Sequence, residues 1–161
     1  MRKISIISIF VLFCGICSAQ YVDLGLPSGT KWKSKNQSGF WDHQTALNQF
    51  EKNLPSNYDW NELKAYCDWE WDGTGYKITG PNGNSIILPA AGKSDGSQKG
   101  YYGEYISCTN KYEPPKTIFE NGGTTQYFYF YFNSDNMTSD SYFWSKYAEL
   151  KEMSVRLIQK P

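Results

Sequence analysis

The sequence predicts a single α+β domain over residues 20–161, preceded by a signal peptide over residues 1–19. Three observations support this prediction. Short strand-like segments lie near both ends of the chain, and two successive segments between residues 42 and 68 have apolar residues at helical spacing. After them, alternating segments are separated by turns rich in Gly, Pro and Asn, which is typical of a mainly antiparallel set of strands.

The N-terminus has the features of an export signal. Basic residues at positions 2–3 precede an apolar run over residues 4–13, and the small residue Ala19 marks the expected cleavage position. The apolar run is too short for a membrane span of about 20 residues, so we expect none in the mature chain. Lipoprotein processing at Cys14 or Cys17 is the alternative, but a large residue precedes each cysteine. We expect a secreted, periplasmic or cell-surface protein.

The first part of the domain is predicted to form two short strands and two helices. Residues 21–26 are the first strand, and residues 30–33 are the second, with Trp32 on its buried face. The segment 42–53 begins at a capping Asp42 and has one apolar helical face.

The second helix is predicted over residues 57–68. Ser56 and Asp59 resemble a capping box, although an aspartate stands where glutamate or glutamine is usual. Its apolar face is formed by Trp60, Leu63 and Cys67.

A β-hairpin is predicted in the middle of the chain. Two strand-like runs, residues 76–79 and 85–88, flank a segment in which Pro81 fixes one backbone torsion and Gly83 tolerates a positive φ. The small residues of positions 89–92 are expected to be buried after the hairpin.

The last third of the domain is predicted to contain three strands, over residues 101–108, 127–132 and 154–158. A long loop over residues 109–125 separates the first two. In the second, Phe and Tyr alternate, and we expect the Phe face to be buried and the Tyr hydroxyls to be solvated or hydrogen-bonded. Residues 133–136 form a turn after it.

The charge and aromatic content restrict the function. With 16 basic and 16 acidic residues and no basic run, the chain lacks the positive stripe of a nucleic-acid-binding protein. Aromatic residues make up 17% of the chain, including 13 Tyr. This content suits strand and core packing, and it also suits surfaces that stack on sugars.

The mature chain has two cysteines and one histidine, the residue types that form disulfides, nucleophilic catalytic sites and zinc sites. Either Cys67 and Cys108 form a disulfide, which an export compartment permits, or both are buried free thiols. His43 is the only histidine and is expected to face solvent at a helix start. Because this single histidine is expected to be exposed, we predict neither a catalytic triad nor a zinc site.

Metal binding and carboxylate catalysis are the remaining alternatives. Calcium prefers oxygen ligands, and the turn at residues 133–136 and the set Asp68, Glu70 and Asp72 are rich in oxygen atoms. Ordinary turn chemistry explains both better, so we expect no cofactor and no metal.

A glycan hydrolase would need two carboxylates. The candidates are Glu70, Asp72, Glu104 and Glu113.

Four blocks of the sequence, at residues 21–32, 54–71, 80–92 and 154–157, together resemble a family of exported Bacteroidetes proteins. The chain is similar to the Fibrobacter succinogenes major paralogous domain and, more distantly, to the C-terminal domain of Legionella collagen-like proteins. Ile106 and Cys108 stand where the relatives have Trp and Ser. The resemblance implies a C-type-lectin-like fold, with paired first and last strands, two early helices and long loops.

The resemblance also implies where a ligand would bind. The loops at residues 93–104 and 109–125 and the turn at 133–136 are expected to form the site. The candidate binding residues are Tyr101, Tyr102, Tyr112 and Asn136.

The sequence is compatible with three functions. We expect a non-enzymatic binding module for a glycan or a surface protein. The alternatives are an adhesin-type structural protein, which would associate through the Tyr face of residues 127–131, and a carboxylate-dependent hydrolase.

Overall fold

The computed structural model describes residues 21–113, 124–144 and 151–161, so the predicted signal peptide lies outside the described part. The elements are β1 (Tyr21–Asp23), β2 (Lys31–Lys33), β3 (Trp41–Asp42), α1 (His43–Phe50), the 3-10 helix η1 (Glu51–Asn53), α2 (Asn57–Tyr66), β4 (Asp68–Trp71), β5 (Gly75–Thr79), β6 (Ser85–Pro89), β7 (Gly103–Glu113), β8 (Thr124–Phe132), β9 (Met137–Trp144), β10 (Glu152–Met153) and β11 (Ile158–Gln159). This is an α+β architecture, as predicted.

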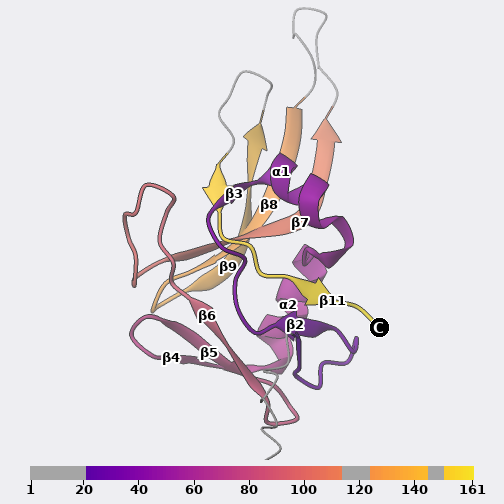
Figure 1. Cartoon of the computed structure of the whole chain (residues 1–161), viewed down its shortest axis with the longest axis vertical. Coiled ribbons are helices and arrows are strands. Elements are labelled where there is room, and N and C mark those ends of the chain that lie inside the picture. Colours follow the sequence, from indigo (N-terminus) through magenta and orange to yellow (C-terminus); the bar gives the residue numbers. More distant parts are fainter. Residues whose placement is uncertain (1–20, 114–123, 145–150) are drawn as a thin grey trace, which may run out of the picture.

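The named strands form antiparallel sheets (Figure 1). The longest strands make a sheet of order β7-β8-β9, and a second sheet has the order β4-β5-β6. Near the C-terminal end of the chain, β11 lies beside β2 in a sheet of order β1-β2-β11. The pair β10-β3 completes the set.

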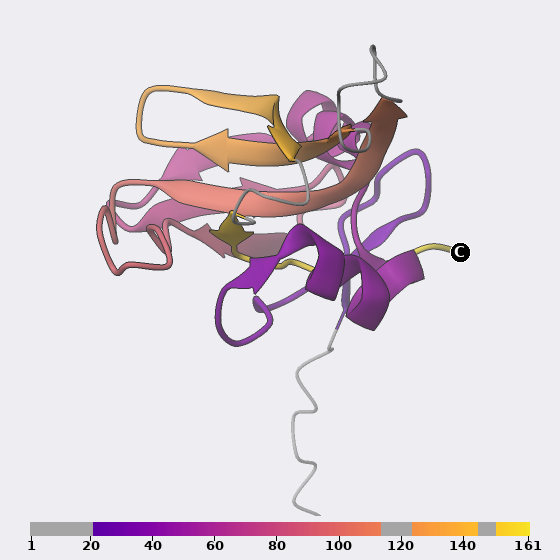
Figure 2. The ribbon, with the colours of Figure 1, turned by 90° about the horizontal axis from the view of Figure 1, so that it is seen from above.

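The β7-β8 pair separates two hydrophobic clusters, with α1 on one side and α2 on the other (Figure 2). On the α2 side, Trp60 stacks on Phe130 with ring centroids 4.8 Å apart. On the α1 side, Ala46 belongs to the cluster that contains Ile106 and Tyr129. Because both faces of β8 are covered over its second part, its sequence is aromatic at every position from Tyr127 to Phe132.

The helices form where the local signals place them. The Asp42 side chain accepts a hydrogen bond from the backbone N–H of Thr45, which caps α1. Ser56 and Asp59 form a complete capping box at the start of α2, so aspartate replaces the usual glutamate successfully. No helix in the three described ranges combines the length and apolar character that a membrane crossing requires.

The β5-β6 hairpin, which the sequence predicted, holds the N-terminal segment in place. The side-chain amides of Asn82 and Asn84 both donate to the carbonyl oxygen of Asp23, at 3.0 and 2.9 Å. Gly80 lies so close to this segment that a Cβ atom there would be 2.0 Å from the carbonyl oxygen of Leu24. The absence of a side chain at position 80 therefore allows the contact.

We expect Gly80→Ala to lower the free energy of unfolding by about 2 kcal/mol, because the new methyl group meets backbone atoms that cannot move aside easily. Gly83→Ala is the matched control in the same turn. Its φ of +85° is strained for alanine, but the space around it is open, so its cost is about 1 kcal/mol. Urea unfolding followed by tryptophan fluorescence measures both; an equal cost for the two variants would contradict the proposed clash.

The strands in the second half of the chain differ in part from those predicted. The loop expected at residues 109–125 is shorter, because β7 continues to Glu113 past an irregularity between Ile106 and Asn110, and β8 begins at Thr124. The strand β9, which pairs with β8 over its whole length, was not predicted. Phe130 and Phe132 are buried, as expected for the Phe face of β8. The rings of Tyr127 and Tyr129 on the other face are buried too, and the Tyr129 side chain hydrogen-bonds to Asp140.

The C-terminal segment was also only partly predicted. The expected strand at residues 154–158 is reduced to short pairings at its two ends and one parallel bridge between Tyr105 and Ser154. Between them, the carbonyl groups of Val155 and Leu157 accept hydrogen bonds from the backbone of residues 33–37. The first and last strands do not pair with each other, because β2 lies between them.

Candidate functional site

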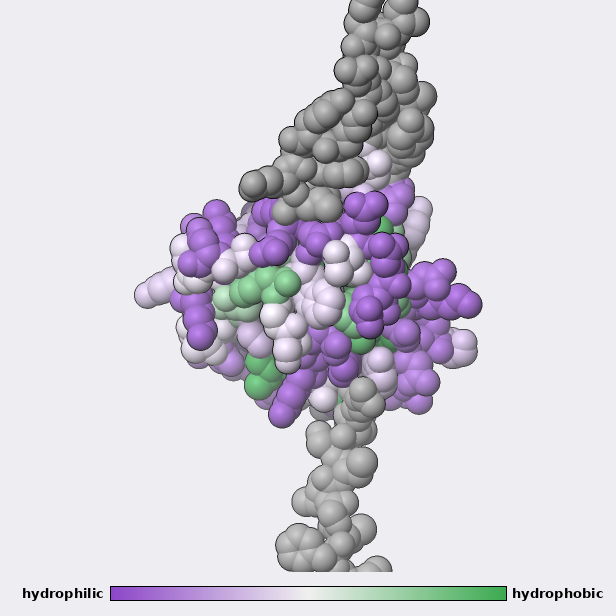
Figure 3. Space-filling view, turned by 45° about the horizontal axis from the view of Figure 1, so that its top comes forward, coloured by the Kyte–Doolittle hydropathy of each residue, from purple (hydrophilic) through white to green (hydrophobic). Residues whose placement is uncertain are grey.

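The described part of the chain forms several surface cavities. On the face in Figure 3, hydrophilic residues dominate and hydrophobic residues gather in small, separate patches. Two of the cavities in the described part of the chain border the loop between β6 and β7, each with different residues of that loop. This is the loop that the sequence analysis placed in the binding site.

The loop of residues 92–102 is held in shape by its own backbone. The N–H of Gly92 donates to the carbonyl oxygen of Tyr102 at 2.8 Å, and that of Gly100 donates to Ala90 at 2.8 Å. A Cβ atom at Gly92 would lie 2.4 Å from the carbonyl oxygen of Ser97, so the turn closes only around a glycine. The loop therefore presents its side chains from a fixed frame.

One side of this frame forms a cavity of about 320 Å³, which we call the Tyr101 surface. Its lining residues are Gln98, Tyr101, Tyr102, Asn133, Ser134 and Asp135. The Tyr101 side chain is 78% exposed, and the other residues contribute amide, hydroxyl and carboxylate groups. An exposed aromatic ring beside such groups can pack on a ligand while the polar groups orient it.

The turn between β8 and β9 forms the opposite wall and is rigidly built. The Asn133 side-chain oxygen accepts hydrogen bonds from the backbone N–H groups of Asp135 and Asn136, at 2.9 and 2.8 Å. The hydroxyl of Tyr76 donates towards the carbonyl oxygens of Asn133 and Ser134, at 3.1 and 3.2 Å. The turn is thereby attached to the core.

Tyr102 supports the loop more than it faces the cavity. Its hydroxyl donates to Glu104 at 2.8 Å, and its ring lies 5.8 Å from that of Tyr131. Burial raises the pKa of this hydroxyl, and the bond to Glu104 raises it further. Glu104 is buried and also pairs with Lys151. A carboxylate engaged by two partners is poorly placed for the acid–base role that a hydrolase would require.

The structure brings together only part of the predicted set. Tyr101 and Tyr102 meet the turn that contains Asn136, which is exposed. Tyr112 pairs with Thr125, far along β7 from the end where Gly103 pairs with Phe132, and its side chain lies outside the described part.

Four residues of the Tyr101 surface were not named as binding residues from the sequence. Asn133, Ser134 and Asp135 had been noted as oxygen-rich, which was a usable signal. Gln98, with a φ of +57°, lies in the loop of residues 93–104 that was expected to form the site, but nothing in the sequence singled out this residue.

The expectation that His43 faces solvent was wrong. Its ring is fully buried and lies 4.7 Å from the ring of Tyr127, at a tilt of 30°, and its Nε2 lies 2.8 Å from the carbonyl oxygen of Phe128. Burial lowers the pKa of His43 to about 4, against the opposing effect of the Phe128 carbonyl. The side chain is a neutral part of the core between α1 and β8.

The oxygen-rich sets noted as calcium candidates serve as turn and surface groups. Asp72 accepts hydrogen bonds from the backbone and hydroxyl of Thr74, which lower its pKa, while Asp68 and Glu70 point to solvent from β4. Among the residues that the structure describes, no three His, Cys, Asp or Glu side chains gather around a common metal position. The Glu113 side chain lies outside the described part.

Both cysteines of the domain are free thiols in the structure. Cys67 is buried in the cluster on the α2 side, and burial raises its pKa to about 11. Cys108 is half-buried against the other cluster, and burial raises its pKa as well. At neutral pH both are therefore largely unreactive thiols.

In comparisons with protein-family models, with curated proteins and with solved structures, the chain has no match. We therefore base the function on the contacts, charges and exposure of the residues described above.

Proposed function

We propose that the protein is an exported, non-enzymatic binding module that recognises a glycan with the Tyr101 surface. The observation that carries this proposal is the 78% exposure of Tyr101 at the edge of a cavity whose other walls are polar. A pyranose ring has one face of C–H groups and a periphery of hydroxyls. It would pack on the Tyr101 ring and place its hydroxyls against the polar walls.

The polar groups around Tyr101 suit sugar hydroxyls. The Asp135 carboxylate accepts hydrogen bonds only, whereas the Gln98 amide and the Ser134 hydroxyl can both donate and accept. The backbone bonds of the turn hold Ser134 and Asp135 in one arrangement before any ligand arrives. Such preorganisation lowers the entropy cost of binding.

The proposal includes a C-type-lectin-like fold and relationship to the exported family that the sequence resembles. It is supported by the two early helices and by a sheet that contains both the first and the last strand. The ligand loops then lie between β6 and β7 and between β8 and β9, and the N-terminal charged and apolar pattern supports export.

A glycan array probed with the purified protein, with calcium and with a chelator, tests this function. We expect reproducible binding to one class of glycan in both conditions. Tyr101→Ala should weaken that binding at least about fivefold, because it removes the only exposed ring of the surface, and loss of one stacking contact of this size costs about 1 kcal/mol or more.

Tyr58→Ala is the matched control, because Tyr58 is 84% exposed on α2 and does not line the Tyr101 surface. It should leave glycan binding unchanged. Full affinity in Tyr101→Ala would show that glycans do not bind at the Tyr101 surface. A blank array in both conditions would contradict glycan binding and favour a protein partner. Loss of binding on chelation alone would restore calcium as a cofactor.

A further inference from the structure

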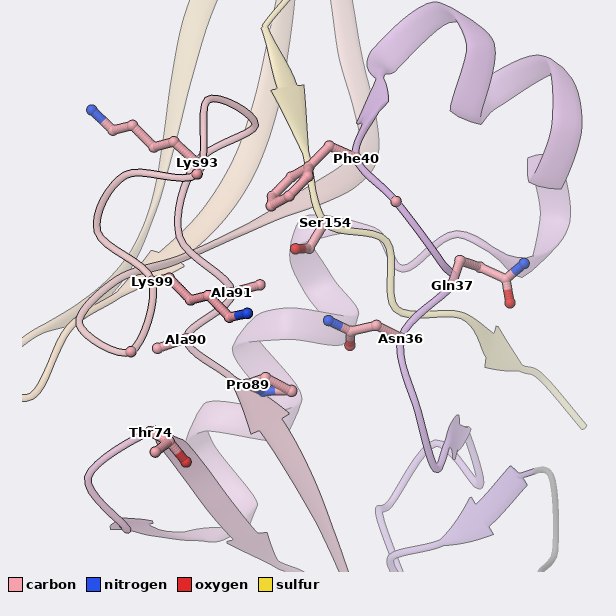
Figure 4. Close-up of a pocket in the computed structure, with 13 residues that line it drawn as sticks. Asn36, Gln37, Phe40, Thr74, Pro89, Ala90, Ala91, Lys93, Lys99 and Ser154 are labelled. Atoms are coloured by element: carbon pink, nitrogen blue, oxygen red, sulfur yellow. The ribbon is translucent and has the colours of Figure 1, made fainter.

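A second cavity, of about 570 Å³, lies where five segments of the chain meet (Figure 4). Its walls come from residues 36–40, the turn before β5, the end of β6 with residues 90–91, the loop of residues 93–100, and Ser154. None of these residues lines the Tyr101 surface. The volume is within the range of about 300–1,000 Å³ that is usual for small-molecule sites.

The charged residues that line this cavity are all positive. Lys93 and Lys99 are the only charged residues that line it, and no carboxylate does. The Lys99 side chain extends towards Asn36 across the cavity, whereas the Lys93 amine points away (Figure 4). Lys99 forms no ion pair with any carboxylate in the described ranges. Its ammonium group is therefore available to a ligand anion.

Two neutral groups face the same space. Ser154 is only 3% exposed, its hydroxyl points into the cavity, and it forms no side-chain hydrogen bond with a described residue (Figure 4). A hydroxyl that opens on a cavity and has no protein partner can donate a hydrogen bond to a ligand or accept one from it.

The Asn36 amide is held in one orientation, because its oxygen accepts from Arg156 at 2.8 Å and its nitrogen donates to Tyr105 at 2.9 Å. The second hydrogen of that nitrogen is free to donate into the cavity.

The rest of the lining is mainly apolar. The half-buried Phe40 ring stands beside Ser154 in Figure 4, and Pro89, Ala90 and Ala91 form the facing wall. A flat ring would fit between these surfaces and remove apolar area from water, with its charged group directed to Lys99.

We propose that this cavity binds a small monocarboxylate attached to a six-membered ring. Lys99 would pair with the carboxylate, and the Asn36 amide and the Ser154 hydroxyl would complete its hydrogen bonds. A single ammonium group matches a single negative charge, whereas a phosphate dianion would call for further positive groups or a nest of backbone N–H donors. The ring can be a sugar or an aromatic ring, and the site is independent of the glycan proposal.

The test is a titration of the purified, isotope-labelled protein, followed by the amide NMR signals of Ala91, Lys99 and Ser154. The probes are glucuronate and benzoate, with glucose, benzyl alcohol and inorganic phosphate as comparisons. We expect saturable shifts of these signals with at least one acid, and affinity at least about tenfold lower for its neutral counterpart and for phosphate. Binding of glucuronate alone would identify a sugar acid, and binding of benzoate alone would identify an aromatic acid.

Lys99→Met should weaken binding of the acid about tenfold, since it removes the charged partner and keeps the length of the side chain. Lys77→Met is the charge-matched control, because Lys77 is exposed on β5 and does not line the cavity. The proposal is overturned by equal affinities for acid and neutral compound, by tighter binding of phosphate, by an unchanged affinity in Lys99→Met, or by the absence of shifts with both acids at millimolar concentration. None of these results changes the expected outcome of the glycan array, because the two cavities share no lining residue.

Discussion

Replacing Arg156 by leucine is expected to lower the free energy of unfolding by about 3–5 kcal/mol, because three part-buried acceptors lose their charged donor together. The guanidinium is fully buried. Its Nε donates to the Asn36 side chain at 2.8 Å, one terminal nitrogen donates to the Lys33 carbonyl at 2.6 Å, and the other donates to the Ile87 carbonyl. Each acceptor left unpaired costs about 1–3 kcal/mol.

The position of Arg156 explains why the loss is large. The side chain joins the segment after β2 to the edge of β6, and the Asn36 amide extends the network to the Tyr105 hydroxyl, which donates to Pro89 at 2.7 Å. In the described residues its partners are carbonyl, amide and hydroxyl groups rather than a carboxylate. Burial lowers the pKa of Arg156, but a guanidinium remains charged at any ordinary pH.

Urea unfolding followed by tryptophan fluorescence measures the effect. Arg156→Lys keeps the charge but not the planar fork of donors, so we expect an intermediate loss of about 1–3 kcal/mol. Tyr105→Phe, which removes one hydroxyl from the same network, should cost about 1 kcal/mol. A loss below about 1 kcal/mol for Arg156→Leu would show that the desolvation of the guanidinium cancels its hydrogen bonds.

The second large effect is a loss of stability in mild acid, caused by His43. Its pKa is about 4 in the folded protein and 6.5 in a model peptide. Above pH 6.5 the ring is neutral in both states, and its full contribution to stability is present. As the pH falls from 6.5 to 4, the unfolded chain gains a proton that the folded protein excludes, so the free energy of unfolding decreases by about 3 kcal/mol.

A non-titrating variant isolates this effect from the carboxylates. His43→Gln retains an N–H donor for the Phe128 carbonyl, and the difference in stability between it and the natural protein should change by about 3 kcal/mol between pH 7.5 and pH 4. Because the chain has one histidine, its NMR titration gives the folded pKa directly. A pKa near 6.5, or parallel pH curves for the two proteins, would contradict the burial of a neutral ring.

The features that sequence reasoning predicted well depend on neighbouring residues. The capping box of Ser56 and Asp59 spans three positions, and the hairpin of β5 and β6 is determined by the turn at residues 80–84. Such short-range signals act in the same way in most proteins.

The features that were missed depend on contacts between distant positions. The burial of His43 follows from β8, whose Phe128 carbonyl is 85 positions later. Likewise, β7 extends past Cys108 because β8 continues to pair with it, and the two lysines of the second cavity become neighbours of Asn36 only in the folded chain. Hydrophobic periodicity carries no information on which element will cover a given face.

The placement of residues 153–158 has a consequence for how the protein is made. Met153, Val155, Arg156 and Ile158 are fully buried, and Arg156 bonds to residues as many as 123 positions earlier. A chain emerging from the ribosome can close neither hydrophobic cluster until this segment has been synthesised. Contacts across such sequence separations also slow folding. A chain that stays unfolded until residues 153–158 appear suits the export that we propose, because a translocation channel takes unfolded chains.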